Sequence, residues 1–290
     1  MARPQIDPSL MFFSTGLKAY EGKTNRAMVD CLSRLFGEDW WTDNGFHYNR
    51  FSDYLNCLQT TAELNWANAE ICSPLMPYVE ELMLDATGIS VTTHGSYRAD
   101  RYGFISDTAR YLRLNLAMDR RFKIFPVALV TPEKGENSGE LSQAPLLLAR
   151  LKALGYTAKY VLGDLLYSTE PMHEAILAFG AEPVIPFKTI YTPARLPTSD
   201  LMRRFYKQLL ADPEAFRARY RYRVLIEAEI SALKRRFSEN IRSREPIARV
   251  NEILFKVLCH NICCIIHAAK VHGLDLSVML RADPLEVFRG

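Results

Sequence analysis

The 290-residue sequence predicts a mixed α/β fold, in which helices cover a sheet of antiparallel and parallel strands. Two observations predict it: three strand-like segments follow one another after residue 80, and helical and strand-like segments then alternate. Successive strands favour antiparallel neighbours, whereas alternating units favour parallel strands covered by helices. With 48% hydrophobic residues, a chain of this length can bury a core of the size that such a fold needs.

Residues 1–80 are predicted to be mainly helical. MVDCLSRLFG and RFSDYLNCLQTTAELNWANAE carry apolar residues at helical spacing, and the turn-rich stretch WWTDNGFH separates them. Because no obvious linker divides this region from the rest of the chain, we expect its helices to pack on the sheet.

The first three strands are expected between residues 81 and 131. ELMLDATGIS (81–90) is a short apolar run broken by one aspartate, with a β-like or ambiguous period. YLRLNLAMD (111–119) alternates cleanly between apolar and other residues, and FKIFPVALVT (122–131) follows almost at once. The last two segments together predict a β-hairpin.

Helices and strands are expected to alternate from residue 141 onward. Gly155 follows the first of these helices as a C-terminal cap, and Ser168 or Thr169 caps the start of the second. In chain order, the expected elements are a helix over 141–155, a strand over 160–164, a helix over 168–180, a strand over 183–187 and helices at about 199–211, 213–240 and 246–272.

This order, three strands followed by two helix–strand units, is the one found in ribonuclease H-like folds. The fold class predicted for the chain is therefore a ribonuclease H-like mixed sheet flanked by helices. We predict a helical N-terminal region over residues 1–80, the ribonuclease H-like domain over 81–272 and a short C-terminal tail over 273–290.

Cysteine usage and hydropathy predict a cytoplasmic protein. The six cysteines show no disulfide-framework spacing, no apolar run reaches the ~18 residues that span a bilayer, and the N-terminus lacks a secretory pattern. Cys259, Cys263 and His267 share one helical edge, which a zinc ion could use. Packing in an apolar helix is the favoured interpretation of this row, because cysteine is a common core residue.

The net charge of +3 is unevenly distributed along the chain. Residues 201–250 hold 13 Lys and Arg against 6 Asp and Glu, so the other 240 residues carry a net charge of −4. Residues 1–75 hold 6 basic and 9 acidic side chains. The basic block indicates a phosphate-rich partner, with an ordinary solvated surface as the alternative.

Two aspartates end segments that otherwise read as buried strands. Asp85 ends LMLD, and Asp164 ends YVLGD. An ionised carboxylate beside a core strand is costly unless a cation or hydrogen bonds satisfy it. In the predicted order the two strands are neighbours, so both carboxylates are expected at one edge of the sheet. The alternative for each residue alone is a turn or capping role.

The helix predicted from residue 220 to 237 adds a third acid. At about 100° per residue, Tyr220, Arg223, Glu227 and Lys234 fall within roughly a 60° arc, and Glu229 points the opposite way. A solvated face with an Arg223–Glu227 ion pair is the alternative. Three converging acids would favour a bound cation, and oxygen-only ligands favour magnesium or manganese.

The spacing Tyr220-x2-Arg223-x3-Glu227-x6-Lys234 resembles the Y-R-E-K signature of a large group of bacterial insertion-sequence DDE transposases. DATGIS and YVLGDLLYST are similar to the segments that carry the first and second aspartate of that family. The resemblance extends over about residues 80–272.

The resemblance implies a transposase: metal-dependent cleavage at the ends of a mobile element, followed by attack of the freed 3′-hydroxyl on target DNA. It implies that Asp85, Asp164 and Glu227 are the catalytic residues and ligands of two Mg²⁺ or Mn²⁺ ions. The residues implied or expected to contact DNA are Tyr220, Arg223, Lys234, Lys188, Arg235, Arg242 and Arg244.

The implied partners are double-stranded DNA and a second copy of the chain, forming a dimer on DNA, and a nucleoid-associated location in the cytoplasm follows. For Lys188 a solvated loop, and for Tyr220 packing at the helix start, stay open as alternatives. His94 and Asp119 lie near the acids in the chain, but solvated-loop and strand-end roles are favoured. The alternative functions are a catalytically weak DNA-binding protein of transposase descent and a ribonuclease H-like nuclease without strand transfer.

Overall fold

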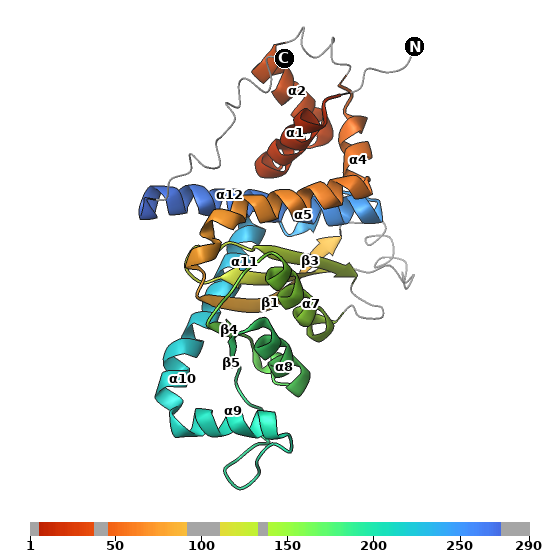
Figure 1. Ribbon diagram of the computed structural model, residues 1–290. Helices are drawn as coiled ribbons and strands as arrows, with labels where there is room; N and C mark the ends of the chain where they lie inside the picture. Colours follow the sequence, from red (N-terminus) through yellow and green to blue (C-terminus); the bar gives the residue numbers. More distant parts are fainter. Residues whose placement is uncertain (1–5, 38–45, 92–110, 133–138, 274–290) are drawn as a thin grey trace, which may run out of the picture. The chain divides into compact units, whose positions relative to one another are not determined.

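A computed structural model describes residues 6–37, 46–91, 111–132 and 139–273 (Figure 1). The chain divides into two compact units. The sheet unit comprises residues 72–90 and 107–232, and the helical unit comprises residues 1–71, 91–106 and 233–290. The units combine segments that are distant in sequence, and the linear boundaries predicted above stay a prediction.

The sheet unit contains a mixed sheet with the strand order β3-β2-β1-β4-β5. β1 pairs antiparallel with β2, and β2 with β3, whereas β1–β4 and β4–β5 are parallel. The predicted mixed α/β class is therefore confirmed. The strands are β1 (Glu81–Val91), β2 (Tyr111–Asp119), β3 (Val127–Pro132), β4 (Tyr160–Leu162) and β5 (Glu182–Val184).

The central strand β1 is longer than its parallel neighbour. The LMLD pattern suggested that Asp85 ends a buried run of residues. In the structure Asp85 pairs with Leu116 inside the β1–β2 ladder, so it lies within the strand. β4 stops at Leu162, which pairs with Met83. Asp164 follows two residues later and therefore comes level with Asp85 at the place where β1 loses its parallel neighbour.

Two helices pack side by side against this sheet (Figure 1). α7 (Glu140–Ala153) contacts β2 and β3, and α8 (Glu170–Phe179) contacts β5. The short 3₁₀ helix η2 (Leu165–Tyr167) connects β4 to α8, and another, η1 (Ser73–Tyr78), precedes β1. The core between them includes Leu82, Leu84, Ala117, Leu147, Leu148, Leu151, Val161, Tyr167 and Ile176.

The prediction of one continuous helix over residues 213–240 is wrong, because a 3₁₀ segment interrupts it. α9 (Asp200–Ala211) is followed by α10 (Pro213–Tyr220), the 3₁₀ segment η3 (Arg221–Arg223) and α11 (Val224–Phe237). In a 3₁₀ turn, side chains three residues apart eclipse one another. The offset of about 60° expected between Tyr220 and Arg223 in an α-helix is thereby reduced.

The helical unit is built around the long helix α12 (Pro246–His272), with α5 (Leu58–Cys72) running alongside it (Figure 1). Asn261 Nδ2 donates to Asn68 Oδ1 at 2.7 Å between these two helices. A second core cluster includes Met28, Leu32 and Phe51. The remaining elements of this unit are α1 (Pro8–Glu21), α2 (Asn25–Phe36), α4 (Asn49–Leu55) and β6 (Asn240–Ile241).

The expectation that no segment is long and apolar enough to cross a bilayer is wrong for α12. This helix meets that test by length and composition, although 67% of its most apolar window is buried inside the protein. Its buried polar side chains are satisfied internally. Lys256 Nζ donates to the carbonyls of Ser238 (3.0 Å) and Asn240 (2.7 Å), and Asn251 donates to the carbonyl of Leu55 (2.8 Å). Such internal bonding favours a core helix.

The three residues of the cysteine row on α12 differ in burial: Cys263 is half-buried and His267 is exposed. Cys259 is buried, its Sγ donates to the carbonyl oxygen of Gly16 at 3.5 Å, and burial raises the pKa of its thiol to about 12. The packing interpretation therefore fits Cys259, a buried thiol with a backbone partner.

Candidate active site

Three acidic side chains from three elements meet around one guanidinium group. Arg223 Nη2 lies 3.6 Å from Asp85 Oδ2 and 3.9 Å from Asp164 Oδ2, and Nη1 pairs with Glu227 Oε1. The two aspartate oxygens are therefore at most about 7.5 Å apart, because the path through Nη2 cannot be shorter than the direct distance. We refer to these four residues as the acid cluster.

The backbone holds both aspartates in a similar way. Asp85 Oδ1 accepts a hydrogen bond from the amide of Ala86 at 2.9 Å, and Asp164 Oδ1 accepts one from Leu166 at 2.8 Å as the cap of η2. In each case Oδ1 is fixed locally and Oδ2 faces Arg223. Gly163 permits the close turn here, because a Cβ at that position would lie 2.8 Å from Cδ2 of Tyr167.

Exposure of the side chains is graded across the acid cluster. Asp85 and Arg223 are 14% and 18% exposed, whereas Asp164 is 34% and Glu227 51% exposed. A ligand from solvent would therefore meet Glu227 and Asp164 first, and Asp85 is the least exposed of the three acids.

Burial and neighbouring charge both act on the ionisation of the cluster. Burial raises the pKa of Asp85, and the charges of Asp164 and Glu227 raise it further, while Arg223 and the Ala86 amide oppose the shift. Burial alone would lower the pKa of Arg223, but the surrounding carboxylates, Asp85 foremost, hold it above its ordinary value. The cluster is thus a group of repelling anions that one cation stabilises.

Sequence reasoning missed a fourth carboxylate. Glu140, at the first position of α7, is hydrogen-bonded to the Tyr167 hydroxyl, and its pKa is raised by burial and by the charges of Asp85 and Asp164. Its Oε1 atom is buried without a hydrogen-bond partner among the described residues. An acid in the first turn of a helix is expected for its favourable interaction with the helix dipole alone, so the sequence carried no signal for this proximity.

Tyr220 packs at the end of α10 and also lies near the acids. Its ring stacks on Phe216, with centroids 5.4 Å apart and planes inclined by 14°. Burial raises the pKa of its hydroxyl, and the charges of Asp164 and Glu227 contribute to the shift. Tyr220 therefore packs at the end of α10 and not at the start of a helix, and the same hydroxyl is influenced by two acids of the cluster.

The other predicted DNA-contacting residues lie elsewhere. Lys188 is exposed four residues after β5, in the sheet unit. The remaining four belong to the helical unit: Lys234 and Arg235 in the last turns of α11, and Arg242 and Arg244 after β6. Arg242 Nη1 donates to the carbonyl oxygen of Gly22 at 2.9 Å. None of these residues belongs to the acid cluster.

The two further candidates near the acids in sequence have different outcomes. His94 lies outside the described residues. Asp119 is the last residue of β2, where it pairs with Leu82, three positions along β1 from Asp85. The strand-end interpretation of Asp119 is therefore confirmed.

The acid cluster fits a divalent cation in its donor chemistry. Carboxylate oxygens alone are the ligands that magnesium and manganese prefer. Among the described residues, however, no group of three His, Cys, Asp or Glu side chains is arranged to hold a metal ion. The guanidinium of Arg223 contacts all three acids of the cluster, so holding a cation there requires Arg223 to move.

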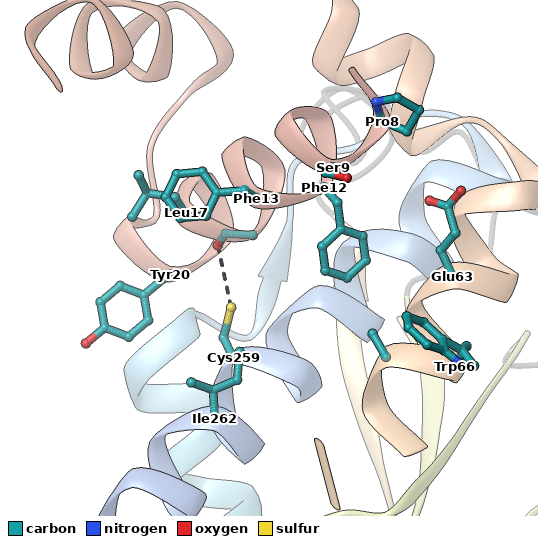
Figure 2. A pocket seen from close by; sticks show the side chains of 12 residues that line it. Pro8, Ser9, Phe12, Phe13, Leu17, Tyr20, Glu63, Trp66, Cys259 and Ile262 are labelled. Carbon is teal, nitrogen blue, oxygen red and sulfur yellow. Dashed lines mark hydrogen bonds between the residues drawn. The ribbon is translucent and has the colours of Figure 1, made fainter. Parts of the chain in front are cut away.

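An apolar cavity of about 650 Å³ opens in the helical unit (Figure 2). Phe12, Trp66, Cys259 and Ile262 contribute to its wall, and Glu63 is its one charged lining residue. None of the predicted site residues lines it. Its chemistry does not match a phosphate-rich partner, so the acid cluster remains the candidate active site.

Comparison with known protein families gives a match, which covers the part of the chain that carries the acid cluster. Residues 80–262 match a family model described as the transposase DDE domain. The matched region includes the strands of the sheet unit, all three acids of the cluster and Arg223. No curated protein matches the chain. Since the family match covers more than half of the sequence, the chain belongs to the transposase DDE domain family.

Proposed function

We propose that the protein is a transposase of the Y-R-E-K insertion-sequence type, with a ribonuclease H-like catalytic domain. It cleaves the ends of a mobile element in a metal-dependent reaction and joins the freed 3′-hydroxyl to target DNA. The observation that carries the proposal is the convergence of Asp85, Asp164 and Glu227 on Arg223. The family match supports the transposase class.

In this proposal Asp85, Asp164 and Glu227 would hold two divalent ions, Mg²⁺ or Mn²⁺. When bound, such ions activate a water or a 3′-hydroxyl and stabilise the leaving oxygen of a phosphodiester. The aspartates suit this role because their Oδ1 atoms are fixed by backbone amides, which leaves both Oδ2 atoms oriented to the same point. Fixed ligands lower the cost of reorganisation during the reaction.

Arg223 has two competing partners in this proposal. Without DNA, its guanidinium neutralises the three carboxylates. A phosphodiester that enters beside the partly exposed Glu227 offers the guanidinium a second bidentate acceptor. Movement of Arg223 onto the phosphate frees the carboxylates for the cations, so DNA binding and cation binding favour each other.

Several finer features belong to the same proposal. Tyr220 contacts the DNA near the cleaved strand, and Lys188, Lys234, Arg235, Arg242 and Arg244 contact phosphates. The protein acts as a homodimer on DNA, in the nucleoid of the cytoplasm. The surplus of Lys and Arg in residues 201–250 supports a phosphate-rich partner.

The experiment uses a plasmid that carries the gene with its natural flanking DNA, together with a second plasmid as target. Purified protein and Mg²⁺ are expected to nick the DNA at the boundaries of the element and to join those ends to the target. Nicking without joining would indicate a ribonuclease H-like nuclease. If the protein binds the flanking DNA but does not nick it, the result would indicate a DNA-binding protein of transposase descent. The net charge of −3 on residues 1–75 is the observation that motivates this alternative. Either result overturns the proposal.

A further inference from the structure

Two stacks of a guanidinium group on an aromatic ring fasten the segment before α11 to the sheet unit. Arg219, in the last turn of α10, lies over the ring of Tyr160 at 3.9 Å from its centroid. Three residues later the roles are reversed: Arg120, which follows β2, lies 3.3 Å from the ring centroid of Tyr222 in η3. The segment is therefore anchored on both sides of Tyr220.

Both anchors sit at the same end of the sheet. Tyr160 begins β4 and pairs in register with Glu81, the first residue of β1. Arg120 is bound to that same Glu81: its Nη1 lies 2.5 Å from Oε2, and its amide donates to the Glu81 carbonyl at 3.1 Å. The Arg120 guanidinium is thus fixed by β1 before it meets Tyr222.

The ring of Tyr222 has a guanidinium group as a second neighbour. Arg221 lies 4.9 Å from the ring centroid, and its Nη2 atom is 3.0 Å from the Tyr222 hydroxyl. Arginine over the face of tyrosine is a favourable cation–π geometry. Because η3 contains only three residues, an anchor on Tyr222 also limits the positions open to Arg223, the next residue.

We propose that Arg120 and Tyr222 are positioning residues for the acid cluster, and that they act through Arg223. Glu81 orients Arg120, Arg120 holds Tyr222, and the short turn of η3 then directs the Arg223 guanidinium to Asp85, Asp164 and Glu227. The inference rests on the proposed function, because its consequence is measured as cleavage and binding of DNA.

Three substitutions test the stack, and one of them, Arg120→Met, also removes the ion pair with Glu81. Arg120→Met removes the guanidinium and keeps a long unbranched side chain, and Tyr222→Leu removes the ring. Tyr222→Phe keeps the ring and loses only the hydroxyl contact with Arg221. Arg121→Met is the matched control, since Arg121 is in the same turn and has the same charge but lies over Tyr78 and Phe122.

The first measurement is hydrogen–deuterium exchange of the full-length variants without DNA. Exchange at residues 221–224 is expected to rise at least fivefold in Arg120→Met and Tyr222→Leu, while strand β1 stays as protected as in wild type. Tyr222→Phe and Arg121→Met are expected to match wild type throughout.

The second measurement is cleavage and DNA affinity, with and without Arg223→Gln. Arg120→Met and Tyr222→Leu are expected to lower cleavage about tenfold, Tyr222→Phe less than twofold, and Arg121→Met no more than its lost charge weakens DNA binding. In the Arg223→Gln background, Tyr222→Leu should weaken DNA binding no further, because both changes remove the same positioned guanidinium.

Three results would overturn the inference. Exchange at 221–224 that does not respond to Tyr222→Leu refutes the anchor itself. Action through Arg223 is refuted if Arg120→Met cleaves DNA as fast as Arg121→Met. It is also refuted if Tyr222→Leu weakens DNA binding as much in the Arg223→Gln background as it does in wild type. If the wild-type protein cleaves no DNA, the proposed function fails and the inference fails with it. The cleavage assay of wild type is enough to show this outcome.

Discussion

Two aspartates on the β1–β2 pair have opposite surroundings. Asp119 is completely buried at the end of β2, and its carboxylate accepts hydrogen bonds from backbone amides of its own turn, including Phe122 at 2.6 Å. Asp85 is partly exposed on β1 and faces two other acids and an arginine. Asp119 is held by backbone donors of its own turn, and its Oδ1 has no hydrogen-bond partner among the described residues. The Asp85 carboxylate instead shares the guanidinium of Arg223 with carboxylates from two other elements.

Substitutions in the acid cluster are expected to have the largest effect on DNA cleavage. Asp85→Asn, Asp164→Asn and Glu227→Gln are each expected to lower Mg²⁺-dependent DNA cleavage roughly 1,000-fold, because each removes a charged ligand of the proposed ions. Thermal unfolding should show that the variants stay folded. Near-wild-type cleavage by any one of them would remove that residue from the site.

Arg223→Gln is expected to act in two directions. Cleavage should fall roughly 100-fold, because a phosphate-binding cation is lost. Mn²⁺ affinity without DNA, measured by electron paramagnetic resonance, should rise roughly tenfold, because the carboxylates lose a competing ion-pair partner. An unchanged or weaker Mn²⁺ affinity would contradict the competition between guanidinium and metal ion.

Asp119→Asn tests the other half of the comparison through pH dependence. Burial raises the pKa of Asp119 from 3.8 to about 6 in the folded protein. The folded state therefore binds more protons than the unfolded state between these values, and the free energy of unfolding falls as pH rises through this window.

Relative to Asp119→Asn, wild type is expected to lose about 2 kcal/mol of stability between pH 4 and pH 7. Urea denaturation of both proteins across that range measures the difference. Parallel pH profiles would show that the carboxylate does not titrate as its burial requires. Cleavage by the variant should stay near the wild-type rate.

Glu229→Gln is expected to have the smallest effect. Glu229 is on α11 close to Glu227 in sequence, but it pairs with Lys123 at 2.9 Å, and the lysine is nearly half exposed. Loss of such a pair should cost no more than about 1 kcal/mol. Cleavage should be unchanged, and a loss comparable to that of Glu227→Gln would undo the distinction between the two faces of the helix.

Much of this architecture could be predicted because local patterns agreed with the tertiary structure. The alternation of apolar residues in YLRLNLAMD predicted β2, and the alternating strand-like and helical segments over residues 160–187 predicted β4, α8 and β5. The parallel pairing of β1 with β4 then brought Asp85 and Asp164 level.

The remaining features depend on contacts between distant residues. The break of the predicted helix at η3 accompanies the stacks on Tyr160 and Tyr222, which helical periodicity cannot reveal. Glu140 reaches the cluster only because α7 packs over β2 and β3.

Binding of Mn²⁺ to the purified full-length protein tests the central claim most directly. Free and bound ions are counted by electron paramagnetic resonance in wild type, Asp85→Asn, Asp164→Asn and the control Glu229→Gln. Wild type and Glu229→Gln are expected to bind Mn²⁺ alike, and both aspartate variants are expected to lose that binding. Equal binding by wild type and the two aspartate variants would contradict a shared cation site at the acid cluster.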